Sequence, residues 1–180
     1  LLLLDNQLVI THGNGPQVGK LLLASAVARG RITPQSLDIL VAQTQGGIAY
    51  LLAQAFENAL RAVGSPRHVV GLVTQVEVDP QDPAFAAPSK PVGPYFTEGE
   101  AQALAEQFGV TVKADGRAWR YVVPSPQPRH ICDISLVEAL MCTRTVVVAG
   151  GGGGIPVVRD GIGCRHGVEA VIDKDLTTAA

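Results

Sequence analysis

The sequence lacks an apolar run close to the roughly 18 residues that a membrane-spanning helix requires. It has three cysteines, Cys132, Cys142 and Cys164, with no CxxC pair and no metal-ligand spacing, which fits a reducing cytoplasm. Basic residues are not in excess, because 14 Lys and Arg stand against 16 Asp and Glu for a formal net charge of −2. This balance argues against nucleic acid as the main partner. We therefore expect a cytoplasmic protein that uses small molecules and binds neither membranes nor nucleic acid.

What the sequence has in quantity is glycine, and five glycines stand in a row at Gly150–Gly154. The preceding residues 146–149 are mostly valine, which predicts a buried strand that opens into this loop. Successive glycine N–H groups can converge on an anion such as phosphate or carboxylate. A flexible turn is the alternative, and it is disfavoured because ordering each glycine costs about 0.5–1 kcal/mol relative to alanine. No Gly-Lys-Ser/Thr follows, and Ile155-Pro156 stands where a dinucleotide-binding helix would start, so neither familiar nucleotide loop is present.

A second candidate loop lies near the start of the chain. Residues 8–11 predict a short buried strand, and residues 17–29 predict a helix preceded by Pro16. Between them stand Gly13, Asn14 and Gly15. A strand, a glycine turn and a helix together aim free N–H groups and a helix dipole at an anion. The alternative is that Asn-Gly only forms a turn.

Two lysines have unusual neighbours. Lys90 lies in residues 79–96, where repeated prolines predict a stiff loop that is neither a helix nor a central strand. A restricted backbone helps an ammonium reach a phosphate, although most loop lysines are simply solvated.

Lys174 lies between Asp173 and Asp175, at the end of a strand predicted for residues 168–176. The two carboxylates keep the lysine charged and can aim it, as phosphoryl transfer requires. A solvated surface triplet is the alternative. The residues alone do not decide which aspartate orients the lysine.

The remaining patterns predict alternating helices and strands. Thr33-Pro34 should cap a helix that runs to about Val63, and Gly46-Gly47 inside it should permit close packing, a kink or a dimer contact. Further predictions are a strand at 68–78, a helix at 97–108 opened by a capping box, a turn at 113–116, strands and loops at 119–128, a helix at 134–141 and a hairpin turn at 159–163. This order implies a three-layer α/β/α sandwich with a mainly parallel sheet, whose glycine loops lie at the carboxyl ends of the strands.

Six segments, in this order along the chain, resemble carbamate kinase of the amino acid kinase family. They are residues 11–19, 45–46, 89–94, 122–126, 150–156 and 170–176. The resemblance covers nearly all of the chain. It implies reversible phosphoryl transfer between ATP and carbamate with Mg²⁺, often run to make ATP from carbamoyl phosphate and ADP. It also implies a cytoplasmic homodimer, often in arginine metabolism.

The resemblance implies a role for each matched residue. Gly13, Asn14 and Gly15 match the loop near the transferred phosphoryl group, and Gly151, Gly152, Gly153 and Gly154 match the carbamate-side loop. Lys90 matches a lysine of a protruding subdomain, which we place at about residues 79–128. Lys174, with Asp173 and Asp175 beside it, matches the phosphate-contacting lysine and its organiser.

Two parts of the family pattern have no counterpart in the chain: an opening strand that ends in Gly-Gly-Asn, and the carboxyl-terminal half with most of the nucleotide pocket. The chain also starts on Leu1–Leu4 without a methionine, which we interpret as the tail of a helix. We therefore expect residues 1–180 to be a fragment that carries the carbamate and phosphate side. We do not expect it to make ATP alone.

Two other functions stay open. Another amino acid kinase, acting on a carboxylate substrate, would share the glycine loops but not the Lys90-Pro-Val-Gly-Pro segment. A catalytically inactive homologue that binds small anions would fit the missing halves.

Overall fold

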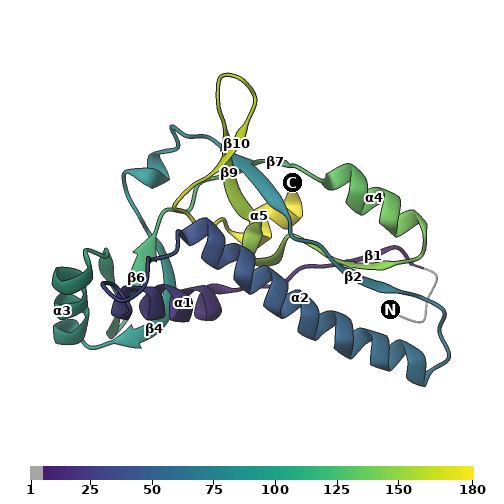
Figure 1. Cartoon of the computed structure of the whole chain (residues 1–180), viewed down its shortest axis with the longest axis horizontal. Coiled ribbons are helices and arrows are strands. Elements are labelled where there is room, and N and C mark those ends of the chain that lie inside the picture. The colour runs from purple at the N-terminus through teal and green to yellow at the C-terminus, as the bar shows by residue number, and fades with distance from the viewer. Residues whose placement is uncertain (1–5) are drawn as a thin grey trace.

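The computed structural model describes residues 6–180, so the interpretation of Leu1–Leu4 lies outside the described residues. Figure 1 shows an elongated arrangement of helices and strands. The helices are α1 (Gly15–Val27), α2 (Leu37–Ala62), α3 (Glu98–Phe108), α4 (Ile134–Cys142) and α5 (Lys174–Ala179). The strands are β1 (Leu8–Ile10), β2 (Val69–Gly71), β3 (Gln75–Val78), β4 (Lys90–Phe96), β5 (Val112–Asp115), β6 (Ala118–Val123), β7 (Pro128–Ile131), β8 (Val146–Val148), β9 (Ile155–Arg159) and β10 (Arg165–Gly167). Short 3-10 turns cover Pro83–Phe85 and Gly151–Gly153.

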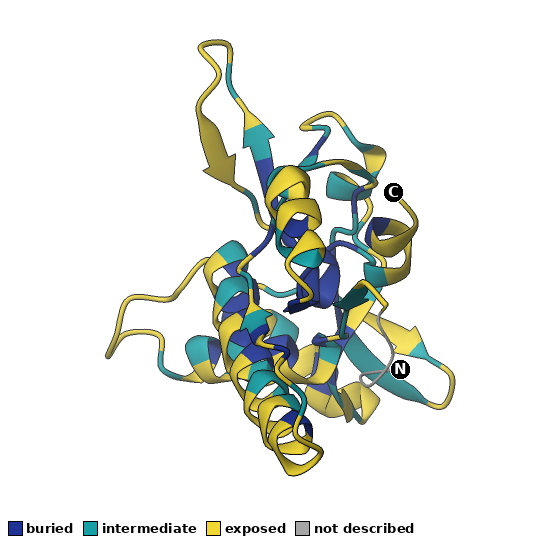
Figure 2. Cartoon of the chain, turned by 90° about the vertical axis from the view of Figure 1, so that its right-hand side faces the viewer, coloured by how far each residue is buried: buried dark blue, intermediate teal, exposed yellow. Residues whose placement is uncertain are grey.

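The centre of the fold is a parallel sheet in the order β1-β8-β2. Successive side chains of a strand point to opposite faces, and β8 follows this rule. Val146 and Val148 pack on α2 residues, whereas Val147 packs with Val137 of α4. The sheet is therefore covered on both faces, which explains why β8 is valine throughout and buried. Figure 2 shows the buried residues, in dark blue, in the interior of the molecule. The predicted three-layer α/β class is confirmed.

A second sheet, β10-β9-β3-β7, continues from the ends of the first one. Its central pair, β3 and β9, is parallel, and its outer pairs are antiparallel. The single strand predicted for residues 68–78 is wrong, because this stretch forms β2 in the first sheet and β3 in the second. The connection at 72–74 runs beside the glycine loop, with the Leu72 N–H donating to the Val148 carbonyl at 2.8 Å. Two neighbouring segments thus cross together from one sheet to the next.

A third sheet, β4-β6-β5, is antiparallel and packs with α3 and α1. The predicted loop at 79–96 is wrong from Lys90 onward, since β4 starts there. Its prolines are tolerated because β4 is an edge strand. Residues 113–115 likewise belong to β5, and the turn lies at Gly116, whose φ is +66°. β7 was not predicted, and it also begins with a proline on a sheet edge.

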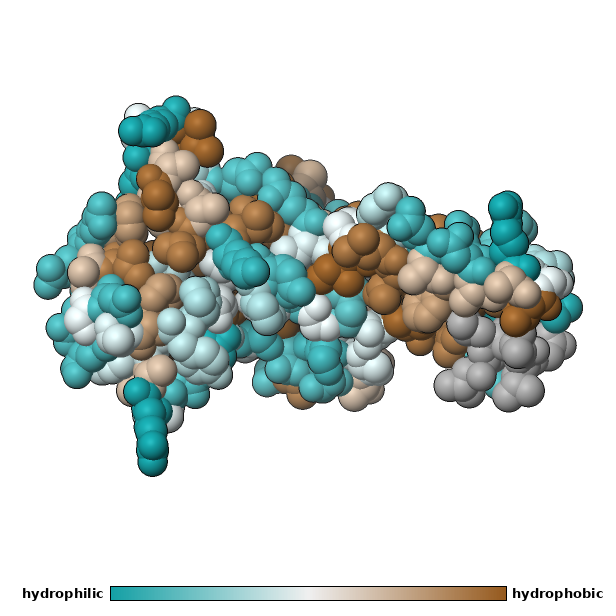
Figure 3. Space-filling view, turned by 90° about the horizontal axis from the view of Figure 1, so that it is seen from below, coloured by the Kyte–Doolittle hydropathy of each residue, from teal (hydrophilic) through white to brown (hydrophobic). Residues whose placement is uncertain are grey.

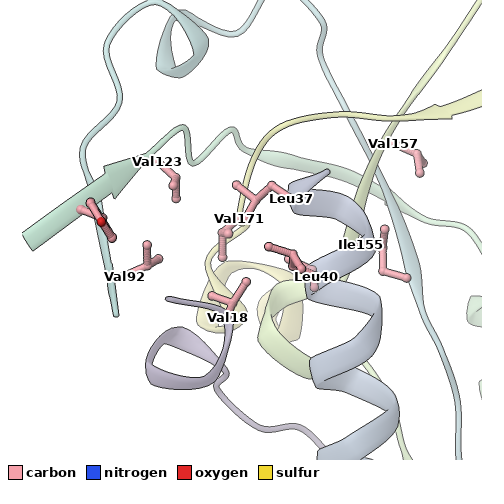
Figure 4. Packing of buried hydrophobic residues seen from close by; sticks show 10 residues of the cluster. Val18, Leu37, Leu40, Val92, Val123, Ile155, Val157 and Val171 are labelled. Carbon is pink, nitrogen blue, oxygen red and sulfur yellow. The ribbon is translucent and has the colours of Figure 1, made fainter. Parts of the chain in front are cut away.

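The main core joins the third sheet to the rest of the molecule. Figure 4 shows side chains of α1, α2, β4, β6 and β9 meeting around Val171, which is fully buried. Gly19 of α1 lies against Gly93 of β4, and a Cβ on Gly19 would stand 2.0 Å from the Gly93 Cα. These two glycines allow the sheet to sit directly on α1, which fixes the position of Lys90 at the start of β4.

The helix boundaries follow local signals in part. α3 begins with the predicted capping box of Thr97 and Glu100 and ends at Gly109, whose φ is +66°. The predicted cap at Thr33-Pro34 is wrong, because Ser36 stands at the N-cap of α2. α2 continues through Gly46-Gly47, where an added Cβ would meet nothing within 4 Å, so packing inside the described chain does not explain these glycines. None of the helices in the described part combines the length and apolar character needed to cross a membrane.

Candidate functional site

The predicted glycine loop lies where β1 and β8 end, and three other segments press against it. A Cβ on Gly152 would stand 2.2 Å from the Asn14 amide nitrogen, and one on Gly151 would stand 2.3 Å from the His12 ring. A Cβ on Gly153 would stand 2.5 Å from the Ile172 carbonyl oxygen. Gly152 also has a φ of +65°, which side-chain-bearing residues rarely adopt. The glycines therefore bring the first loop and the segment before α5 into one place.

Most N–H groups of this loop are bonded inside the protein. Gly150 donates to the Thr74 hydroxyl at 3.0 Å, and Gly152 donates to the His12 carbonyl at 2.7 Å. Gly153 and Gly154 donate to the carbonyls of Gly150 and Gly151. The packed neighbours thus account for the glycines in this conformation. Anion binding by successive N–H groups of the loop stays a prediction.

A buried polar network that the sequence did not reveal supports the loop. Gln45 of α2 is 1% exposed, donates to the Gly151 carbonyl at 2.8 Å and accepts from the Thr74 N–H at 2.8 Å. The Asn14 amide, 3% exposed, donates to the Thr44 hydroxyl at 2.9 Å. Asn14 stands at the N-cap of α1, yet its side chain makes no cap hydrogen bond. Two signals were available: a pair of polar residues, Thr44 and Gln45, inside an apolar helical pattern, and the match of residues 45–46 to the family, to which no role was assigned.

Lys174 lies beside the first loop. It is the first residue of α5 rather than the end of a strand, so the predicted strand at 168–176 is wrong. The cause is Asp173, which caps α5 by accepting from the Asp175 N–H at 2.9 Å. The Lys174 stem passes Gly13, since a Cβ there would lie 3.8 Å from the Lys174 Cδ and Cε atoms. Its ammonium donates to the Asp175 carboxylate, and this hydrogen bond raises the pKa of Lys174.

Lys90 reaches the same turn from the third sheet. Its Nζ atom lies 2.9 Å from the Asp173 Oδ2 atom, although the two residues are 83 positions apart. Only 22% of the Lys90 side chain is exposed, so the solvated-loop interpretation does not describe it. The hydrogen bond from Lys90 is the main cause that lowers the pKa of Asp173. Each lysine therefore has its own aspartate, and both pairs meet at the start of α5.

This arrangement can hold a phosphoryl group. Two ammonium groups meet at the start of α5, and Gly13, just before α1, lies beside the Lys174 stem. In the first turn of α1, Pro16 has no N–H and the Val18 N–H donates to the Asn14 carbonyl at 2.8 Å, so Gly15 and Gln17 carry the N–H groups that have no acceptor within the helix. A separate cavity of about 370 Å³ is lined by Thr11, Gly150 and Thr178 and by residues of α4 that include Glu138, and neither lysine lines it. Residues 6–180 bring together no group of three metal-ligating side chains. The residues thus suit an anion better than a bare metal ion.

The chain was compared with known proteins. No protein-family model matches it. The carbamate kinase of Pyrococcus horikoshii is 47% identical over 173 residues, which cover 94% of this chain and 55% of the relative. Among solved structures, carbamate kinase from Giardia lamblia bound to citric acid superposes with a TM-score of 0.92 at 42% identity, covering 96% of this chain and 56% of the other. The same enzyme bound to AMP-PNP superposes with a TM-score of 0.81 at 42% identity, covering 96% and 55%.

These matches extend over nearly the whole chain, at identities well above the level at which only a fold is shared. The structural neighbours also confirm the amino acid kinase fold. The chain spans about 55% of the length of the curated relatives it matches. Sequence and structure together therefore place this chain in the carbamate kinase family.

Proposed function

We propose that the chain forms the carbamate and phosphate side of a carbamate kinase, which transfers a phosphoryl group reversibly between ATP and carbamate. The observation that carries this proposal is the meeting of Lys90 and Lys174, with their aspartate partners, beside Gly13. Phosphoryl transfer asks the protein for positioning and charge stabilisation rather than covalent chemistry. Two lysines held by carboxylates at the start of α5 supply both.

Each residue has a proposed part in the reaction. Lys174 stabilises the negative charge that develops on the transferred phosphoryl oxygens. Asp175 orients Lys174, since the two side chains are hydrogen-bonded. Lys90 binds the phosphoryl group of carbamoyl phosphate. Gly13, Asn14 and Gly15 offer the first turn of α1 to the same group, and Gly151, Gly152, Gly153 and Gly154 form the wall against which carbamate lies.

The nucleotide is proposed from the relatives. A Giardia lamblia carbamate kinase structure holds AMP-PNP, which supports ATP and ADP as partners of this family. Mg²⁺ is usually held by one or two carboxylates together with substrate phosphates and not by a cage of protein ligands alone, and the part of the chain that the structure describes brings together no group of three metal-ligating side chains.

The oligomeric state and the cellular location of the protein are proposed as well. A homodimer is supported by the outward face of α2, where Tyr50 and Leu51 are 62% and 60% exposed beside the open Gly46-Gly47 surface. Figure 3 shows the face seen from below, where brown apolar patches lie among teal polar residues. A cytoplasmic location is supported by three cysteines that are all free thiols. A place in arginine metabolism is proposed from the family resemblance alone.

The test uses a chimera in which residues 1–180 replace the matching segment of the Pyrococcus horikoshii relative. ATP formation is measured by a coupled assay with ADP and carbamoyl phosphate, and the parent enzyme serves as the control. We expect turnover with carbamoyl phosphate and none in the reverse assay with acetylglutamate as phosphoryl acceptor. Use of acetylglutamate in its place would identify a carboxylate kinase. A chimera that has the parent's circular dichroism spectrum but no activity would identify an inactive homologue.

A further inference from the structure

The two lysines of the site differ in the kind of partner that holds them. Lys174 pairs with Asp175, its neighbour in sequence, so this contact lies within the first turn of α5. Lys90 pairs with Asp173 across two parts of the fold, because it belongs to β4 of the third sheet. The Lys90–Asp173 contact is therefore one that can open without unfolding α5.

Asp173 has a second function that survives loss of this contact. Its Oδ2 atom accepts from Lys90, while its Oδ1 atom accepts from the Asp175 N–H at 2.9 Å. The carboxylate thus caps α5 with one oxygen and holds Lys90 with the other. Its side chain is 41% exposed, so an arriving solute can approach the pair.

We propose that Asp173 is a positioning residue that holds Lys90 in the empty site and releases it to the phosphoryl group of the substrate. This rests on the proposed function, because it takes the ligand to be a phosphoryl anion. The Asp173 carboxylate accepts from the Lys90 ammonium, and an oxygen of the phosphoryl group would accept from the same ammonium after the exchange. Binding then exchanges one charge-assisted hydrogen bond for another, and the Asp173 carboxylate stays as the cap of α5.

The exchange has a direct consequence for Asp173. While Lys90 is bound, its hydrogen bond and positive charge hold the pKa of the Asp173 carboxyl below its ordinary value. When Lys90 moves to a phosphate, Asp173 loses a cation and gains a nearby anion, and both changes raise its pKa. Lys174 and Asp175 also face this carboxylate, but their mutual pair stays in place during the exchange.

The first test is carbon-13 NMR titration of the Asp173 carboxyl in the 180-residue chain, assigned with Asp173→Asn. We expect Lys90→Met to raise the midpoint, while the matched control Lys113→Met, an exposed lysine of β5, leaves it unchanged. We also expect inorganic phosphate to raise the midpoint of the wild type relative to chloride at equal ionic strength. If Lys90→Met leaves the Asp173 midpoint unchanged, the Lys90–Asp173 pairing is wrong. If phosphate leaves it unchanged, the proposed exchange of Asp173 for phosphate is wrong.

The second test uses the chimera, so it does not depend on how the shorter chain behaves. Asp173→Asn keeps an effective cap for α5 but removes the charge that competes for Lys90. We expect KM for carbamoyl phosphate to fall by about 2- to 5-fold, the scale of losing one partly exposed ion pair, and to change more than kcat does. An unchanged KM would mean that Asp173 acts only as a cap. A raised KM would mean that Asp173 holds Lys90 toward the substrate, and either result overturns the exchange.

The two proposals can fail separately. A chimera that makes ATP while the Asp173 midpoint ignores both Lys90 and phosphate would retain the kinase function and reject the exchange. A folded chimera without activity, in which Asp173 still responds to both, would retain the exchange at an anion site and reject the kinase function.

Discussion

Gly152→Ala tests whether the Asn14 side chain packs so closely on the glycine loop that no Cβ fits at residue 152. The new Cβ would lie 2.2, 2.3 and 2.5 Å from the Nδ2, Cγ and Oδ1 atoms of the Asn14 side chain. Asn14 is buried and hydrogen-bonded to Thr44, so it cannot turn away without losing that bond. Gly152 also has a φ of +65°, which strains any residue with a Cβ.

The magnitude follows from these two effects. Left-handed backbone costs an L-residue about 1–2 kcal/mol, and overpacking a buried contact costs about 1–3 kcal/mol. We expect Gly152→Ala to lower the free energy of unfolding by about 2–5 kcal/mol in urea titrations. The corresponding fall in Tm is at least about 4 °C for a chain of this size.

A matched control separates strain from contact. Gly116 has a φ of +66°, but a Cβ there would meet nothing within 4 Å. Gly116→Ala should therefore show the backbone strain alone, about 1–2 kcal/mol. If the two variants lose equal stability, the approach of Asn14 to the loop is not tight, and our account of the glycines is wrong.

Three further predictions concern the lysines and the chain itself. In the chimera, Lys90→Ala should weaken the use of carbamoyl phosphate, and Lys90→Arg should restore it only in part, because a planar guanidinium differs from a compact ammonium; variants that match the wild type would show that Lys90 has no role. The isolated 180-residue chain should make no ATP in the coupled assay, and turnover above background would show that the further length of the relatives is dispensable. The pKa of Asp173 is lowered by Lys90, so this pair stabilises the fold above the unfolded pKa of about 3.9 and ceases to do so as pH falls through the folded value. Lys90→Met should therefore reduce stability in urea at pH 7 but not in strong acid, and an equal loss at both would contradict the pairing.

The parts of the fold that sequence predicted are those with local signals. The capping box at Thr97 and the glycine at 109 marked both ends of α3, because their effect depends on the neighbouring few residues. The valines of β8 predicted a buried strand. The glycines after it predicted an anion-binding loop, whereas the close approach of His12 and Asn14 to them was not predicted.

The parts that were missed depend on distant segments. Residues 68–78 have the pattern of one strand, yet they form β2 in one sheet and β3 in another, with a connection at 72–74 between them. The prolines of β4 suggested a loop, because nothing in the local sequence shows that this strand is an edge. Lys174 was placed on a strand because the capping by Asp173 competes with the apolar run before it.

For the candidate site, the sequence proposed a set of residues but could not give their arrangement. The resemblance named Lys90, Asp173 and Lys174, whereas no periodicity could pair Lys90 with a carboxylate 83 positions away. The hydrogen bonds of Gln45 could not be predicted, because its two backbone partners lie 29 and 106 positions away in the sequence. The structure also divides the two aspartates, giving Asp175 to Lys174 and Asp173 to Lys90.

Turnover of the chimera that carries Lys174→Ala tests the central claim most directly. Lys174 is argued to stabilise the transition-state charge, and loss of one preorganised donor of this kind typically costs at least about 100-fold in kcat. Circular dichroism and Tm show whether the variant is folded like the wild-type chimera. We predict a kcat at least about 100-fold lower in a folded protein, and a folded variant with near-normal kcat would contradict the account.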